Sequence, residues 1–137
     1  MTRWSLLLSC GAWMGLSACG PMGEALLATE QEVYSPGSEL TVRLHNVSLR
    51  SLHYNLCYIS LQREGPAGWV GVQIREPDES CPAILLNLKP GEAKSTQITL
   101  DSTLAEGTYR FSTSVELDGE RRAVTSNSIQ VTSQAAP

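Results

Sequence analysis

Apolar and polar side chains alternate most regularly between residues 39 and 45, where Leu40, Val42 and Leu44 share one face. Because successive side chains of a β-strand point to opposite faces of a sheet, this alternation predicts a half-buried strand. The same period recurs over residues 108–117, where Tyr109 and Phe111 begin a second apolar face. No stretch after Gly20 carries a convincing helical period, so the patterning predicts an all-β protein.

Further runs rich in β-forming residues are predicted as strands, and turn signals separate them about every eight to twelve residues. The clearest turns are Lys89-Pro90-Gly91-Glu92 and the two-residue hairpin Asp118-Gly119. About 7–8 strands in one small domain, residues 25–133, predict an immunoglobulin-like antiparallel β-sandwich. The additional strands are expected at 25–34, 52–63, 69–74, 81–88, 96–100 and 121–131.

The apolar positions change parity inside the run 52–63. They are even-numbered as far as Leu56 and odd-numbered from Ile59 onward. Since the side-chain period of a strand is two, such a change predicts a β-bulge near Cys57 or Tyr58.

The N-terminus has the order of an export signal. A positive start, Met1-Thr2-Arg3, precedes an apolar run from Trp4 to Leu16 and the small residues Ser17 and Ala18. As a helix, residues 4–18 would cover about 22 Å, less than the roughly 30 Å of a hydrocarbon core. Glycine and proline at residues 20, 21 and 23 oppose its continuation. Residues 1–18 are therefore predicted to be a signal peptide.

The segment Leu16-Ser17-Ala18-Cys19 resembles the lipobox of bacterial lipoproteins. The resemblance implies that diacylglycerol modifies the Cys19 thiol, that cleavage precedes this residue, and that the new amine is acylated. Two or three acyl chains anchor a protein stably, whereas one does so only marginally. Residues 19–24 would form the lipidated tether, and Gly20 in place of aspartate favours the outer membrane in a Gram-negative cell. The alternative is an ordinary secretory signal cut near Ala18.

Removing residues 1–18 takes away one arginine and changes the formal net charge from −4 to −5. An acidic domain whose only lysines are Lys89 and Lys94 is a poor partner for nucleic acid. Cys10 lies in the signal and Cys19 in the lipobox, which leaves Cys57 and Cys81. In an oxidising compartment, two remaining cysteines are predicted to form a structural disulfide, contributing about 3 kcal/mol.

Several turns and strand ends resemble those of small bacterial Ig-like domains, and the intracellular proteinase inhibitor (BsuPI) family shares much of the pattern. The resemblance implies an Ig-like fold over nearly the whole mature chain. It transfers no inhibitory-loop residue, and an export signal departs from an intracellular inhibitor. The segments concerned are Val33–Val42, Leu88–Glu92, Glu106–Arg110 and Ser126–Val131.

Candidate chemistry is sparse. His45 and His53 flank one turn and could meet at one end of the sandwich, but zinc prefers three or four protein ligands. Glu76, Asp78 and Glu79 lack the spacing of a known calcium loop. We therefore predict no catalytic, metal-binding or cofactor-binding residues.

These observations predict a membrane-anchored lipoprotein of the cell envelope that acts as a non-catalytic binding or structural module, with an envelope protein as its possible partner. One alternative is a protease-inhibitor-like domain that presents a loop at 64–68 or 75–80 to an enzyme. A weaker alternative is an envelope hydrolase or metal carrier that uses His45 and His53.

Overall fold

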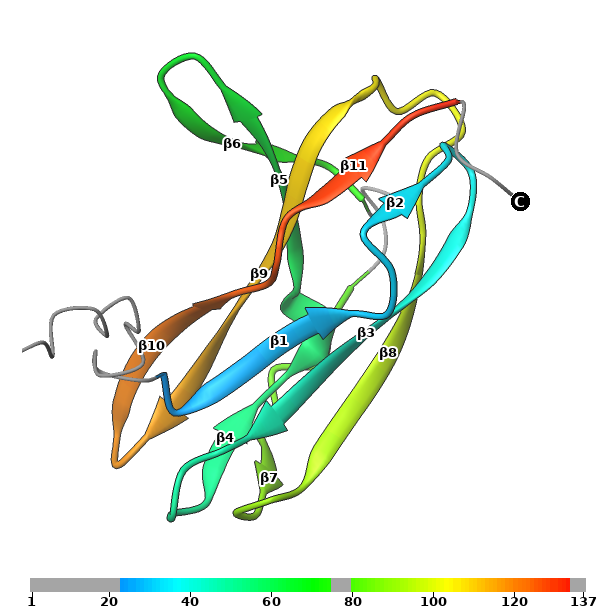
Figure 1. Cartoon of the computed structure of the whole chain (residues 1–137). Helices are drawn as coiled ribbons and strands as arrows, with labels where there is room; N and C mark the ends of the chain where they lie inside the picture. Colours follow the sequence, from blue (N-terminus) through cyan, green and yellow to red (C-terminus); the bar gives the residue numbers. More distant parts are fainter. Residues whose placement is uncertain (1–22, 75–79, 134–137) are drawn as a thin grey trace, which may run out of the picture.

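The computed structural model describes residues 23–74 and 80–133, which fold as two β-sheets packed face to face (Figure 1). The smaller sheet has the strand order β1 (Ala25–Thr29), β3 (Glu39–Asn46), β8 (Ala93–Thr99). The larger sheet is built around β9 (Gly107–Leu117). Its main path has the order β2 (Val33–Tyr34), β11 (Ile129–Val131), β9, β4 (Leu52–Tyr54), β7 (Leu86–Leu88). Two further strands, β10 (Glu120–Thr125) and β5 (Ser60–Gly65), also pair with β9. The last strand, β6 (Gly68–Val72), pairs with β5.

The inward faces of the two sheets form one apolar core, as the alternation predicts. Leu40, Val42 and Leu44 of β3 are buried, and they lie opposite the buried face of β9. Tyr109 and Phe111 are among the largest fully buried side chains. The all-β sandwich expected from the sequence is therefore confirmed. The side chains on the outer faces of the two sheets do not take part in this core.

Tyr109 also ties the start of β9 to the preceding loop. Its hydroxyl donates a hydrogen bond of 2.5 Å to the Ala105 carbonyl oxygen, four residues upstream. This arrangement is the tyrosine corner of immunoglobulin-like sandwiches. Phe111, two residues further on, is fully buried at the position where an antibody domain places a cysteine. An aromatic ring here provides the packing that a disulfide provides there.

Three of the long predicted strands are each divided, so the described residues form eleven strands rather than seven or eight. The run 25–34 changes sheets: β1 pairs with β3, whereas β2 pairs with β11. The β2–β11 pair is parallel, which corrects the expectation of wholly antiparallel sheets. The run 121–131 breaks where the Ser126 Oγ accepts a hydrogen bond from the Phe111 amide.

The run 52–63 contains a 3₁₀ turn, Leu56–Tyr58, rather than the predicted bulge. Asn55 caps this turn, because its side-chain oxygen accepts a hydrogen bond from the Cys57 amide at 3.0 Å. The run 81–88 was also predicted too long, since only Leu86–Leu88 is a strand. In both places, hydrogen bonds from the Asn55 side chain to the backbone compete with the backbone hydrogen bonds between strands.

The two strongest turn predictions are confirmed. Asp118 and Gly119 have φ angles of 52° and 79°, as a two-residue type I′ hairpin requires. In the turn before β8, the Glu92 amide donates to the Lys89 carbonyl oxygen at 3.0 Å, and Gly91 has a φ of 81°. Among the described residues, no helix has the length and apolar character needed to cross a membrane.

Candidate binding groove

An open groove of 570 Å³ lies on the outer face of the larger sheet. Its floor includes Ser112 and Ser114 of β9 and Ser60 of β5. In β9 the neighbouring Phe111, Thr113 and Val115 are buried, so the period of two turns the serines outward. Small hydroxyl side chains leave the strand surface accessible, which makes this part of the sheet shallow and polar.

One wall of the groove is apolar and exposed. Tyr58 is 56% exposed, Ile84 54% and Leu85 52%. Large apolar side chains that gather at an exposed concave site, rather than singly, are typical of binding surfaces. The wall thus places three exposed apolar side chains beside the polar floor.

Side-chain hydrogen bonds hold the wall in place although the segment before β7 is irregular. The Asn55 amide nitrogen donates to the carbonyl oxygens of Pro82 and Ile84, both at 2.8 Å. The Tyr58 hydroxyl donates to the Cys81 carbonyl oxygen at 3.1 Å. These hydrogen bonds attach the 3₁₀ turn to the irregular segment before β7.

Cys57 and Cys81 join the same two segments. The structure places them as a disulfide-distance pair with their Cα atoms 5.7 Å apart, within the range of about 4.4–6.8 Å that disulfides occupy. The cysteine pair expected from the sequence is thereby supported, and it joins the two segments that carry the apolar wall. Cys10 and Cys19 lie outside the described residues.

Polar groups complete the rim of the groove. Glu116 of β9 and Arg121 of β10 are cross-strand neighbours at one end, and Asn55 contributes at the side of the wall. Hydroxyl, amide and charged groups of this kind can donate to and accept hydrogen bonds from a polypeptide backbone. The groove therefore combines an apolar anchor surface with polar groups that can satisfy an extended chain.

The two histidines do not meet, contrary to the suggestion that they could lie together. His45 lies between buried Leu44 and Asn46 on the smaller sheet, so its side chain is on the outer face of that sheet. His53 lies between buried Leu52 and Tyr54 on the larger sheet and faces outward there. The sandwich core separates them. Within 23–74 and 80–133, no group of three or more His, Cys, Asp or Glu residues could hold a metal ion.

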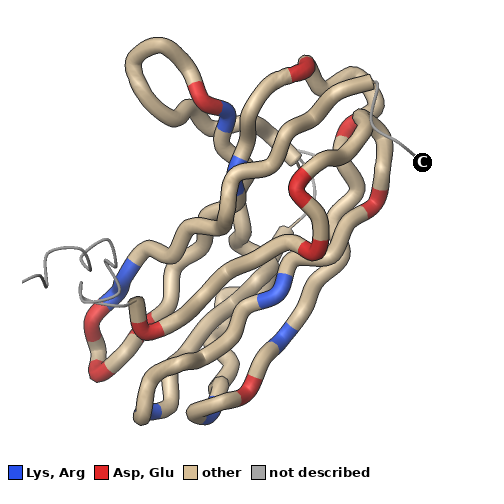
Figure 2. The backbone as a smooth tube through the Cα atoms, in the orientation of Figure 1, with Lys and Arg blue, Asp and Glu red and all other residues tan. Residues whose placement is uncertain are grey.

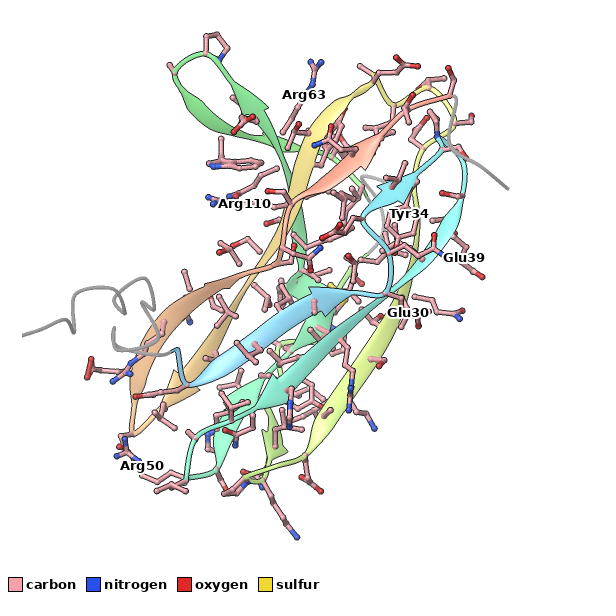
Figure 3. The ribbon with its side chains drawn as sticks, viewed as in Figure 1. Glu30, Tyr34, Glu39, Arg50, Arg63 and Arg110 are labelled. Carbon is pink, nitrogen blue, oxygen red and sulfur yellow. A yellow bond between two sulfur atoms is a disulfide. The ribbon has the colours of Figure 1, made fainter. Side chains whose placement is uncertain are left out.

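The β5–β6 hairpin projects from the body of the sandwich (Figure 1). At its base, the Arg110 guanidinium lies 4.2 Å from the centre of the Trp69 ring and donates to the Gln62 side chain at 2.7 Å (Figure 3). Residues 64–68 form the projecting end, as one alternative function requires. Residues 75–79, which include Glu76, Asp78 and Glu79, lie outside the described residues.

Sequence reasoning missed the apolar wall because it assigned residues 81–88 to a strand. A signal was available: Ile84, Leu85 and Leu86 are consecutive, and a strand cannot direct three successive apolar side chains to one buried face. Such a run implies that at least one of the three is exposed unless both faces of the strand are covered.

The two packed sheets and the tyrosine corner define an immunoglobulin-like β-sandwich. The family model described as "Bacterial Ig-like domain" matches residues 23–131, and the chain belongs to this family. The expected resemblance to small bacterial Ig-like domains is confirmed, whereas the resemblance to the intracellular proteinase inhibitor family and the lipoprotein assignment stay predictions.

Two solved structures are similar to the chain. Alpha-2-macroglobulin from E. coli, in its native conformation, has 18% identity and a TM-score of 0.47. The match covers 81% of this chain and 7% of that chain, so this domain spans a small part of that protein. The ASH or PapD-like domain of human CEP192 has 14% identity and a TM-score of 0.40, with 98% and 99% of the two chains covered. No curated protein matches the sequence.

Proposed function

We propose that this protein is a lipid-anchored, non-catalytic binding module of the cell envelope, and that its groove binds an extended segment of another envelope protein. The anchor rests on the resemblance of Leu16–Cys19 to a lipobox behind a signal peptide. The Ig-like domain supports a binding or structural role, because such sandwiches carry function on exposed faces and loops rather than in buried catalytic clefts.

The observation that carries the proposed partner is the exposed apolar wall of Tyr58, Ile84 and Leu85. Hydrogen bonds from Asn55 and the nearby cysteine pair order this wall before any partner arrives. Pre-ordering reduces the conformational entropy lost on binding, which favours a recognition role.

The shape of the groove favours a polypeptide over a small molecule. Small-molecule sites bury most of the ligand surface, whereas this groove is open along the sheet. The acidic mature chain is also a poor partner for nucleic acid. A protein segment with an apolar side chain for the wall and backbone groups for the Ser112 and Ser114 hydroxyls matches both parts of the site.

A photo-crosslinking amino acid placed at Ile84 in the full-length protein tests this proposal in intact cells. We expect a discrete adduct with one envelope protein, and we expect Ser114→Arg, which fills the floor, to remove it. The matched control is the same crosslinker at Gln97, which is exposed on the smaller sheet. Equal adducts at both positions, or an Ile84 adduct that survives Ser114→Arg, would contradict binding in the groove.

The second candidate function is a protease-inhibitor-like domain, and the projecting β5–β6 hairpin favours it. A loop that enters an enzyme must stand clear of its scaffold, as residues 64–68 do. For an inhibitor of this kind, we expect the domain to inhibit an envelope protease. We expect Ala67→Arg, at the tip of the hairpin, to change the strength of that inhibition. Full inhibition by a variant whose tip is deleted would exclude the hairpin as the inhibitory element.

A further inference from the structure

The chain enters the sandwich beside the β3–β4 loop, residues 47–51. The Val47 amide donates a hydrogen bond of 3.1 Å to the Glu24 carbonyl oxygen. The Glu24 carboxylate in turn pairs with the Arg122 guanidinium of β10 at 2.7 Å, and this bond raises the pKa of that guanidinium. Residue 24 and the β3–β4 loop therefore occupy the same end of the molecule, the end opposite the β5–β6 hairpin (Figure 1).

The β3–β4 loop presents an apolar tip. Leu49 is 94% exposed, more than any other large apolar side chain in the described residues, and Val47 is 40% exposed. A single exposed leucine on a protein surface is ordinary. Leu49 differs because two hydrophobic side chains share one short loop next to the point where the chain enters.

Internal hydrogen bonds fix the conformation of this loop. The buried Asn46 side-chain oxygen accepts from the Ser48 amide at 2.9 Å and from the Ser48 hydroxyl at 2.8 Å. The Asn46 amide nitrogen donates to the Arg50 carbonyl oxygen at 2.8 Å. Because the residues on both sides of Leu49 are held in this way, its outward position is part of the fold.

The proposed anchor lies close to this tip along the chain. Only residues 20–23 separate Cys19 from Glu24. At about 3.6 Å per residue, five steps of fully extended chain reach at most about 18 Å. If Cys19 carries lipid, the end of the domain that contains Leu49 is thus confined to the neighbourhood of the bilayer surface.

Charges of both signs lie at this end and largely pair with one another. Arg50 forms an ion pair with Asp118 of the β9–β10 hairpin, so the Asp118 carboxylate offsets the positive charge of the Arg50 guanidinium. Arg122 pairs with both Glu24 and Glu120, so acidic and basic residues intermingle at this end (Figure 2; Arg50 is labelled in Figure 3). Contact with lipid would therefore depend on the apolar tip rather than on a basic patch.

We infer that the β3–β4 loop inserts Leu49 into the lipid surface beside the anchor and so fixes the orientation of the domain. The inference rests on the proposed anchoring through Cys19. In this orientation the β5–β6 hairpin points away from the bilayer. Attachment through Cys19 alone would let the domain rotate relative to the bilayer, whereas a second contact beside the anchor restricts this rotation.

Tryptophan fluorescence tests the inference with the full-length protein, processed in cells and reconstituted into phosphatidylcholine vesicles. Two variants carry one tryptophan each in the mature chain, Leu49→Trp and the control Ala67→Trp, both with Trp69→Phe. Both positions are exposed loop sites at opposite ends of the domain. We expect brominated phosphatidylcholine to quench the emission of Leu49→Trp and to leave that of Ala67→Trp unchanged.

Mass spectrometry of the same samples separates the two levels of the proposal. An unacylated Cys19 overturns the anchor and, with it, the orientation. An acylated protein in which bromine quenches both variants equally, or neither, leaves the anchor standing and overturns the orientation. Blue-shifted but unquenched emission of Leu49→Trp would show that protein rather than lipid covers the tip, which also overturns it.

Discussion

Asn46 connects the two sheets through its side chain. It is fully buried at the end of β3, in the smaller sheet, and its amide nitrogen donates to the Leu88 carbonyl oxygen in the larger sheet at 2.9 Å. Its backbone amide donates to the Glu92 carbonyl oxygen, also at 2.9 Å. One residue thereby sets both the β3–β4 loop and the turn before β8.

We expect Asn46→Ala to lower the free energy of unfolding by about 2–4 kcal/mol, because it removes several hydrogen bonds and leaves buried polar partners unsatisfied. Chemical denaturation monitored by circular dichroism measures the change. The matched control is Asn87→Ala, at an exposed position of β7, for which we expect less than about 0.5 kcal/mol. Equal denaturation midpoints for the two variants would contradict this role of Asn46.

At the scale of elements, the 3₁₀ turn and the segment before β7 form one unit. Asn55 and Tyr58 bond across it, and the Cys57–Cys81 pair closes a sequence separation of 24 residues. The apolar wall of the groove belongs to this unit. The geometry of the wall therefore depends on side-chain hydrogen bonds and the cysteine pair rather than on the backbone hydrogen bonds of a β-ladder.

We expect the double substitution Cys57→Ala and Cys81→Ala to lower the free energy of unfolding by about 3 kcal/mol, through the larger entropy of the unfolded chain. Thermal unfolding with and without reductant measures it. Reductant should destabilise the unsubstituted protein by a similar amount and leave the double variant unchanged. Two thiols that titrate in the native, unreduced protein would disprove the disulfide.

At the scale of the whole molecule, the three proposed functional regions occupy different places. The groove lies on the outer face of the larger sheet, the projecting hairpin lies at one end, and the chain enters at the other. In the proposed orientation, the bilayer contacts the entry end, and the projecting hairpin points away from it. The hairpin is then accessible to a partner while the domain stays anchored.

The anchor predicts how the whole protein is processed. Cys19→Ser should abolish metabolic labelling with fatty acid and impair maturation, because the proposed acyl acceptor is lost. Cys10→Ser is the matched control, since this cysteine lies inside the predicted signal and should not affect labelling. An unmodified mature N-terminus in the native protein, identified by mass spectrometry, would exclude a lipoprotein.

The sequence by itself determined the fold class, the strands β3 and β9, and the two glycine-containing turns. These features depend on local periodicity and on backbone conformations that few residues adopt, and both are visible in a single chain. The pairing of Cys57 with Cys81 followed by elimination. Of the residues around the candidate groove, the sequence indicated only this pair. It also predicted the loop at 64–68, which projects elsewhere on the domain.

Only the tertiary structure decided how the long runs divide, where the histidines lie and what forms the groove. Residues 25–34 and 121–131 look continuous, but pairing with distant strands and side-chain bonds such as that of Ser126 interrupt them. His45 and His53 are close in sequence, yet they occupy different sheets. The apolar wall exists because Asn55 bonds to residues 27 and 29 positions away. Contacts of such separation leave no local pattern, so packing alone decided them.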